Sequence, residues 1–250
     1  MEIFPIIQPG RTTEDLALES FPFMIISTMT EASIALDLYT KSRQALAGFD
    51  RSRFHGDDTQ AEVPWLALCG APFLHARSFL FAFDNLLKLM ETLSKMLGVS
   101  PKIATIVANF EQAFPTLRET RDSAHHMEDR ILGKARKKAI VVEPGTPLPF
   151  NRLDNPGSFS YSATSIDART GYTLGTLDND VYGNTLASGK YGSLPITRNT
   201  MLTCQRIIQS LFNTIELTSP TSHWKVQPYS VSIMGEDNVA NFARSIGRTV

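Results

Sequence analysis

The chain is poor in cysteine and has no long apolar run. Its 250 residues include two cysteines, Cys69 and Cys204, which lie far apart and outside any CxxC pattern. This usage excludes a disulfide scaffold and a zinc ribbon. No wholly apolar stretch approaches the roughly 18 residues of a membrane span. The first residues also lack a basic start and an apolar signal core, so we expect a cytoplasmic protein with reduced thiols.

Several motifs of enzymes and cofactor sites are also missing. The sequence contains no G-x-x-x-x-G-K-[ST], no G-x-S-x-G and no H-E-x-x-H. His125, His126 and Asp129 are metal-ligating residue types close in sequence, but no further ligand cluster accompanies them. We therefore expect no cofactor and no bound metal.

Charge is balanced overall but uneven along the chain. The net charge is -1, so the surface as a whole does not attract nucleic acid electrostatically. Residues 118–138 nevertheless carry four acids and seven bases, the bases being Arg118, Arg121, Arg130, Lys134, Arg136, Lys137 and Lys138. All except Arg121 are candidate nucleic-acid contacts. The alternative for Lys134–Lys138 is a solvated helix face with a basic last turn, which the helix dipole favours.

Two long helices are expected in the first hundred residues. The first spans Thr13 to about Gly48, with Pro22 at its start or at a kink, and places Ile34, Leu38 and Ala45 on one apolar face. The second is expected from about Pro72 to Leu97. Its core-facing stripe comprises Phe73, Leu80, Phe83, Leu87, Met90, Leu93 and Leu97.

A broken helix follows. Ser100 and Pro101 suit a helix start, and a helix is expected over Ile103–Phe114 until Pro115 interrupts it. Thr116 and Glu119 have the spacing of a capping box, which predicts a new or kinked helix running to about Lys134.

The character of the chain then changes to short strands. Four runs rich in β-branched or aromatic residues are separated by turn signals: Phe159–Ile166, Tyr172–Leu177, Val181–Leu186 and Tyr191–Ile196. They predict an antiparallel meander, and a last helix is expected over about Arg198–Leu217. The fold class is mainly α in one domain, with a helical bundle at about 13–140 and 197–217. A β-rich insertion occupies about 141–196, and residues 218–250 form a C-terminal extension.

The strongest chemical signal is Arg121-Asp122-Ser123-Ala124-His125-His126, within Leu117–Gly133. Arginine grips phosphate bidentately, and histidine is the side chain suited to proton transfer near neutral pH. On a helix Arg121 and His125 are neighbours, while His126 lies about 140° around the axis from Arg121. Asp122 precedes His126 by four residues and can orient it. Residues of these types suit cleavage of RNA without a metal.

The motif and the helix order over residues 13–217 resemble the HEPN superfamily, whose mark is Arg, four to six residues, then His. The resemblance implies a four-helix, dimeric fold and a metal-independent endoribonuclease, as in toxins or phage-defence effectors with a protein inhibitor. Arg121 would hold the scissile phosphate and His126 would transfer protons in a cleft shared by two subunits. Asp122 would position the pair, and His125 is an alternate or helper.

Two other interpretations stay open. The polar helix face could be structural, with Arg121, Asp122 and His125 merely forming salt bridges. The protein could also be a non-catalytic homodimer that binds RNA or a protein partner through its β insertion. Arg121 and the histidines in an open basic cleft favour the nuclease, whereas burial in salt bridges favours the binder.

Overall fold

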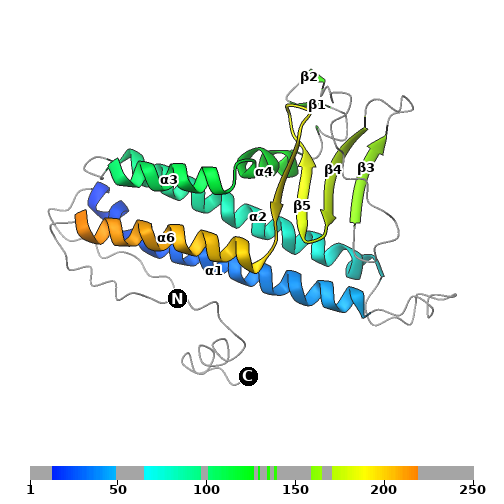
Figure 1. The fold of residues 1–250 in the computed structure, drawn as a ribbon, viewed down its shortest axis with the longest axis horizontal. Coiled ribbons are helices and arrows are strands. Elements are labelled where there is room, and N and C mark those ends of the chain that lie inside the picture. Colours follow the sequence, from blue (N-terminus) through cyan, green and yellow to red (C-terminus); the bar gives the residue numbers. More distant parts are fainter. Residues whose placement is uncertain are drawn as a thin grey trace.

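The computed structural model describes residues 13–48, 65–96, 101–126, 129, 134–135, 138–139, 159–164 and 171–218. These residues form a mainly helical protein with a small antiparallel sheet (Figure 1). The helices are α1 Thr13–Ala47, α2 Trp65–Lys95, α3 Pro101–Ala113, α4 Leu117–His125 and α6 Arg198–Thr218. α1 packs on α2, α2 on α3, α3 on α6 and α6 on α1, so four helices form a closed ring.

The predicted helices are largely confirmed, but the start of α2 is wrong. α1 and α6 match their expected ranges within one residue, and α3 matches within two. α2 begins at Trp65, seven residues before Pro72, which lies inside the helix. A proline inside a helix removes one backbone hydrogen bond. Pro72 and Phe73 are both buried, and this packing offsets the loss.

The predicted core face of α1 is also wrong. Ile34 is 54% exposed and Leu38 is 41% exposed, and Ala45 is exposed as well. The buried side of α1 instead carries Phe21, Ile25, Met29, Ala32, Ala35, Tyr39 and Leu46. The helix is apolar on two sides, so periodicity alone does not identify which side enters the core.

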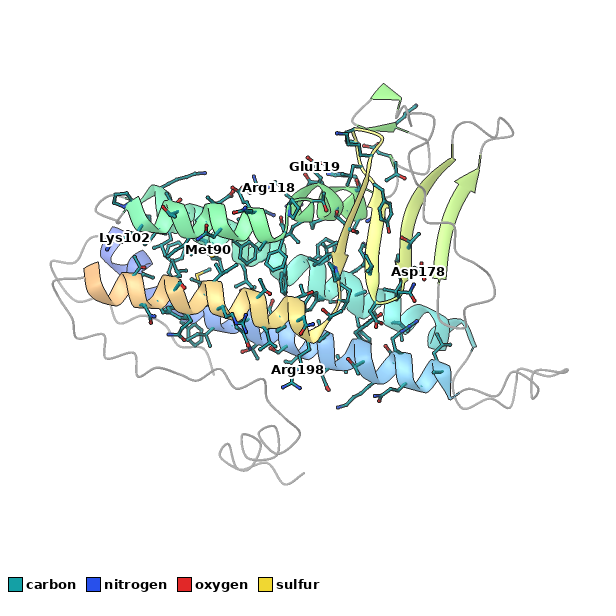
Figure 2. All side chains as sticks on the ribbon, in the orientation of Figure 1. Met90, Lys102, Arg118, Glu119, Asp178 and Arg198 are labelled. Carbon is teal, nitrogen blue, oxygen red and sulfur yellow. The ribbon has the colours of Figure 1, made fainter. Side chains whose placement is uncertain are left out.

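The core is aromatic where α2 meets α3. Phe83 packs 6.3 Å from Phe110 and 5.3 Å from Phe114, measured between ring centroids, and Phe79 lies 4.4 Å from Phe83. Met90 is also fully buried among the helices (Figure 2). The expected α2 stripe from Phe73 to Leu93 is buried throughout, while Leu97 lies outside the described residues.

The predicted meander is confirmed as a sheet in the order β3-β4-β5-β6, all antiparallel. Its strands are β3 Phe159–Thr164, β4 Gly171–Asp178, β5 Val181–Thr185 and β6 Tyr191–Pro195. The β4–β5 hairpin turns on Asn179 and Asp180, whose φ angles are 46° and 61°. Two consecutive positive φ values define a tight hairpin turn, and Asn and Asp tolerate this conformation better than most residues.

Hydrogen bonds and ring packing hold the sheet on the helices. The Tyr39 hydroxyl donates to Asp180 Oδ1 at 2.6 Å, which ties α1 to the hairpin turn. The Asn184 amide donates to the Thr120 carbonyl at 3.3 Å, and the Phe73 and Tyr182 rings lie 5.2 Å apart. Burial raises the pKa of Tyr182 to about 12. The sheet is therefore seated against α1, α2 and α4.

Two features bear on compartment. Cys204 is a free, buried thiol that lies 3.6 Å from the Met29 sulfur, and burial raises its pKa. Ser20–Ala47 is long and apolar enough to cross a membrane by length and composition, contrary to the expectation from its apolar runs. Of its most apolar window, 39% is buried inside the protein, and core helices pass the same test. The cytoplasmic location stays a prediction.

Gly183 in β5 is a sharp test of the sheet packing. A methyl group there would come within 2.0 Å of the Tyr191 hydroxyl and 2.9 Å of the Gly192 carbonyl oxygen. We expect Gly183→Ala to lower the free energy of unfolding by about 2–3 kcal/mol. The control is Gly70→Ala in α2, where the methyl meets nothing within 4 Å. It should gain up to about 1 kcal/mol from helix propensity. Urea unfolding measures both, and equal effects would contradict the described packing.

Candidate functional site

α4, the helix that carries the motif, is fixed at its start by the sheet. Pro115 ends α3, as predicted, but the capping box at Thr116 and Glu119 does not form. The Thr116 hydroxyl instead donates to the Ser193 carbonyl and accepts from the Ser193 amide, both at 3.0 Å. Because the Thr116 hydroxyl makes its hydrogen bonds with β6, it does not cap the N-terminus of α4.

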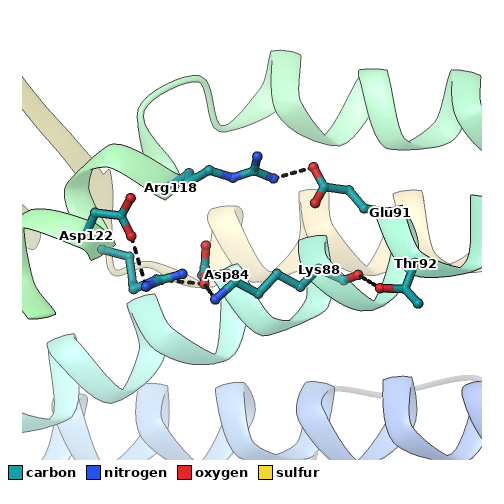
Figure 3. Close-up of polar contacts among 7 residues, drawn as sticks. Asp84, Lys88, Glu91, Thr92, Arg118 and Asp122 are labelled. Atoms are coloured by element: carbon teal, nitrogen blue, oxygen red, sulfur yellow. Dashed lines mark hydrogen bonds and ion pairs between the residues drawn. The ribbon is translucent and has the colours of Figure 1, made fainter. Parts of the chain in front are cut away.

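Arg121 is held by two carboxylates. Its Nε donates to Asp84 Oδ2 at 2.7 Å, and its Nη1 lies 2.9 Å from Asp122 Oδ1 (Figure 3). The Arg121 side chain is only 16% exposed and that of Asp84 only 1%. The guanidinium therefore faces α2, with its Nε and Nη1 atoms each bound to a carboxylate.

Asp84 is the centre of this ion-pair cluster. Lys88 Nζ lies 2.7 Å from the same Oδ2 atom that accepts from Arg121. The other oxygen, Oδ1, is buried and has no hydrogen-bond partner among the described residues. One buried carboxylate oxygen thus binds one cation from α4 and one from α2. This is the arrangement that compensates a buried charge.

A second ion pair joins the same two helices nearer the surface. Arg118 on α4 pairs with Glu91 on α2 (Figure 3). The hydrogen bond to this carboxylate raises the pKa of the Arg118 guanidinium. Arg118 is thus placed beside an acid, although it was a candidate nucleic-acid contact.

The histidines lie at the end of α4, and the helix is shorter than predicted. It ends at His125, nine residues before Lys134, and His126 follows as the capping residue. Its amide donates to the Asp122 carbonyl at 3.0 Å. Arg77 Nη2 donates to the Ala124 carbonyl at 3.0 Å, so a cation from α2 satisfies one of the last carbonyls of α4.

Both imidazoles are exposed and meet each other. Their ring centroids lie 5.1 Å apart with the rings at 69°, in an edge contact. Phe81 of α2 contacts His125 edge-on at 6.4 Å, and the Arg77 guanidinium lies 5.7 Å from the centre of the Phe81 ring. The motif therefore presents two histidines to solvent, while Arg121 points into the α2 contact.

The basic segment after α4 is partly described. β1 Lys134–Ala135 pairs with β2 Lys138–Ala139 in a short antiparallel ladder, so the solvated helix face is wrong here. Lys134 is exposed. Arg130, Arg136 and Lys137 lie outside the described residues. Within the part of the chain that the structure covers, no three His, Cys, Asp or Glu side chains are grouped to hold a metal.

Sequence reasoning missed the residues of α2 that complete the site: Arg77, Phe81, Asp84 and Lys88. One signal was available, because Asp84 is the only charged residue in the run Phe79–Leu87, and a lysine follows it four residues later. An acid on a core-facing stripe requires a cation partner. The sequence pattern does not show that this partner is Arg121, which lies 37 residues away.

The central role of Asp84 makes a stability prediction. Asp84→Ala should lower the free energy of unfolding by about 3 kcal/mol, because it leaves Arg121 and Lys88 beside an emptied buried position. The matched control is Glu91→Ala, which removes the more exposed pair between the same helices and should cost less than about 1 kcal/mol. Urea denaturation at one protein concentration measures both. Equal losses would show that Asp84 is no more important than a surface acid.

Comparison with protein-family models, curated proteins and solved structures finds no match to this chain.

Proposed function

We propose that the end of α4 is the catalytic centre of a metal-independent endoribonuclease built on a HEPN-type helical bundle. The observation that carries the proposal is the pair of exposed, touching imidazoles of His125 and His126. Two histidines at one surface point supply a proton acceptor and a proton donor near neutral pH. Exposed Lys134 would contact the RNA backbone.

The chemistry proposed is transfer of the phosphoryl group within RNA. Neutral His126 takes the proton of a ribose 2′-hydroxyl, and the 2′-oxygen attacks the adjacent phosphorus. The bond from phosphorus to the 5′-oxygen breaks, and protonated His125 gives its proton to that oxygen. The products are a 2′,3′-cyclic phosphate and a 5′-hydroxyl. The two ring centroids lie 5.1 Å apart in the structure, which leaves no room for a phosphate between the rings. Binding of the phosphate therefore requires the side chain of His126, which follows the end of α4, to move away from His125.

Arg121 has a different role here from the one the resemblance implies. Two carboxylates already bind its guanidinium, so gripping a phosphate would require it to exchange one of them. We assign it as a positioning residue that fixes α4 on α2 and thereby aims the two histidines. Asp122 holds Arg121 through its side chain and His126 through its carbonyl.

A second candidate is a non-catalytic protein that binds RNA or a protein partner through the β insertion. The observation that favours it is the burial of Arg121 in salt bridges with Asp84 and Asp122, because this is the arrangement expected for the binding protein and not for the nuclease. A toxin or phage-defence setting and a protein inhibitor belong to the nuclease proposal only, whereas the expected cytoplasmic location applies to both candidates.

Cleavage of labelled total RNA in EDTA tests the proposal. Wild type should cleave and leave 2′,3′-cyclic phosphate ends, and His126→Ala should lose at least about 100-fold in rate. His125→Ala should lose as much. Arg121→Lys, which keeps the charge but not the fork, should keep part of the activity. The matched control is His75→Ala on α2, which removes an imidazole elsewhere and should leave the rate unchanged.

Circular dichroism of each variant separates lost chemistry from lost folding. No cleavage by folded wild type, or equal cleavage by wild type and His126→Ala, would remove the nuclease and leave the binding protein.

A further inference from the structure

The exposed side of α1 carries a regular seam. Its positions follow one another at alternating spacings of three and four, and all are exposed: Met24, Ser27, Glu31, Ile34, Leu38, Lys41 and Ala45 on the helix, and Gly48 directly after its end. This spacing is that of the a and d positions of a coiled coil, and three of the positions carry large apolar side chains, Met24, Ile34 and Leu38. The opposite side of α1 is already buried in the core. The seam is therefore a second packing face, and no helix among the described residues covers it.

The seam is complementary to itself when reversed. Consider a second α1 that lies antiparallel to the first, with residue 36 of one helix opposite residue 36 of the other. The numbers of any two seam residues that face each other then add up to 72. Ile34 then faces Leu38, and Glu31 faces Lys41. Further out, Ser27 faces Ala45 and Met24 faces Gly48. The register thus pairs apolar Ile34 with Leu38, acidic Glu31 with basic Lys41 and small Ser27 with Ala45, and it leaves Met24 opposite Gly48.

We propose that α1 pairs antiparallel with α1 of a second copy of this chain, in this register. A two-fold axis repeats every contact, so the interface has two Ile34–Leu38 layers flanked by two Glu31–Lys41 ion pairs. Met24, Ile34 and Leu38 are 45%, 54% and 41% exposed in the single chain, so pairing removes substantial apolar surface from water.

Charge on the seam selects this occupant over a lipid surface. Glu31 lies on the seam between apolar residues. If the seam lay on a lipid surface, the acyl chains would bury this carboxylate without a cation beside it. The antiparallel copy supplies Lys41. Asp37 flanks the axis, and Lys41 of its own helix already lies 2.9 Å from it, which reduces its repulsion of the equivalent Asp37.

The pairing also separates the two candidate catalytic centres. α2 contacts both α1 and α4, and Figure 1 shows it between them. The histidines at the end of α4 therefore lie away from the α1 seam. In this dimer each copy has its own site, in place of the shared cleft that the HEPN resemblance implies. The inference does not depend on RNA cleavage.

A charge-reversal experiment on the full chain tests both partner and register. Wild type should be a dimer by sedimentation equilibrium. Glu31→Lys places two lysines opposite each other twice, and Lys41→Glu does the same with two glutamates. Each variant alone should raise the dimer dissociation constant by about 10- to 100-fold. An equimolar mixture of the two variants should form the heterodimer, because every lysine at these two positions of one copy then faces a glutamate of the other.

The control is Thr40→Lys, an exposed charge on α1 outside the seam, which should leave the dimer intact. Association of the two variants on mixing also shows that each is folded. A wild type that is monomeric at all concentrations would overturn the proposal. So would single variants that dimerise like wild type, or a mixture that stays monomeric.

Discussion

The ion pair between Arg121 and Asp84 is the contact on which the candidate site depends. α4 is only nine residues long, too short to be stable by itself, and its place is fixed by partners on α2 and the sheet. Asp84 supplies the buried charge, Arg121 reaches it from α4, and Lys88 shares the same oxygen. Because a buried carboxylate is costly without cations, the pair strongly favours one position of α4. That position presents His125 and His126 to solvent.

Local patterns were sufficient for most elements. The β4–β5 hairpin followed from two runs rich in β-branched or aromatic residues on either side of the turn signal Asp178-Asn179-Asp180. α6 and α3 followed from helical periodicity and, for α3, from Pro101 and Pro115 at its ends. Contacts between distant segments were not predictable in this way. Thr116 was assigned to a cap because its own helix offered one, yet Ser193, 77 residues away, binds it.

The same distinction applies to the site and to α1. The motif located the chemistry-bearing residues, but it could not show that Arg121 is committed to Asp84 and Asp122. The seam of Ile34 and Leu38 is a real amphipathic pattern, and only the packing of α1 reveals that it faces outward. A face that periodicity assigned to the core is thus available for a second copy.

The most direct test of the central claim is binding of an uncleavable RNA analogue to the two histidines. A short RNA with a 2′-deoxy residue at the cleavage position can be titrated into the full chain while the imidazole ring protons are followed by NMR. The account predicts saturable shifts of both His125 and His126, with His75 unchanged. Unchanged His125 and His126 signals while the RNA binds elsewhere would contradict it.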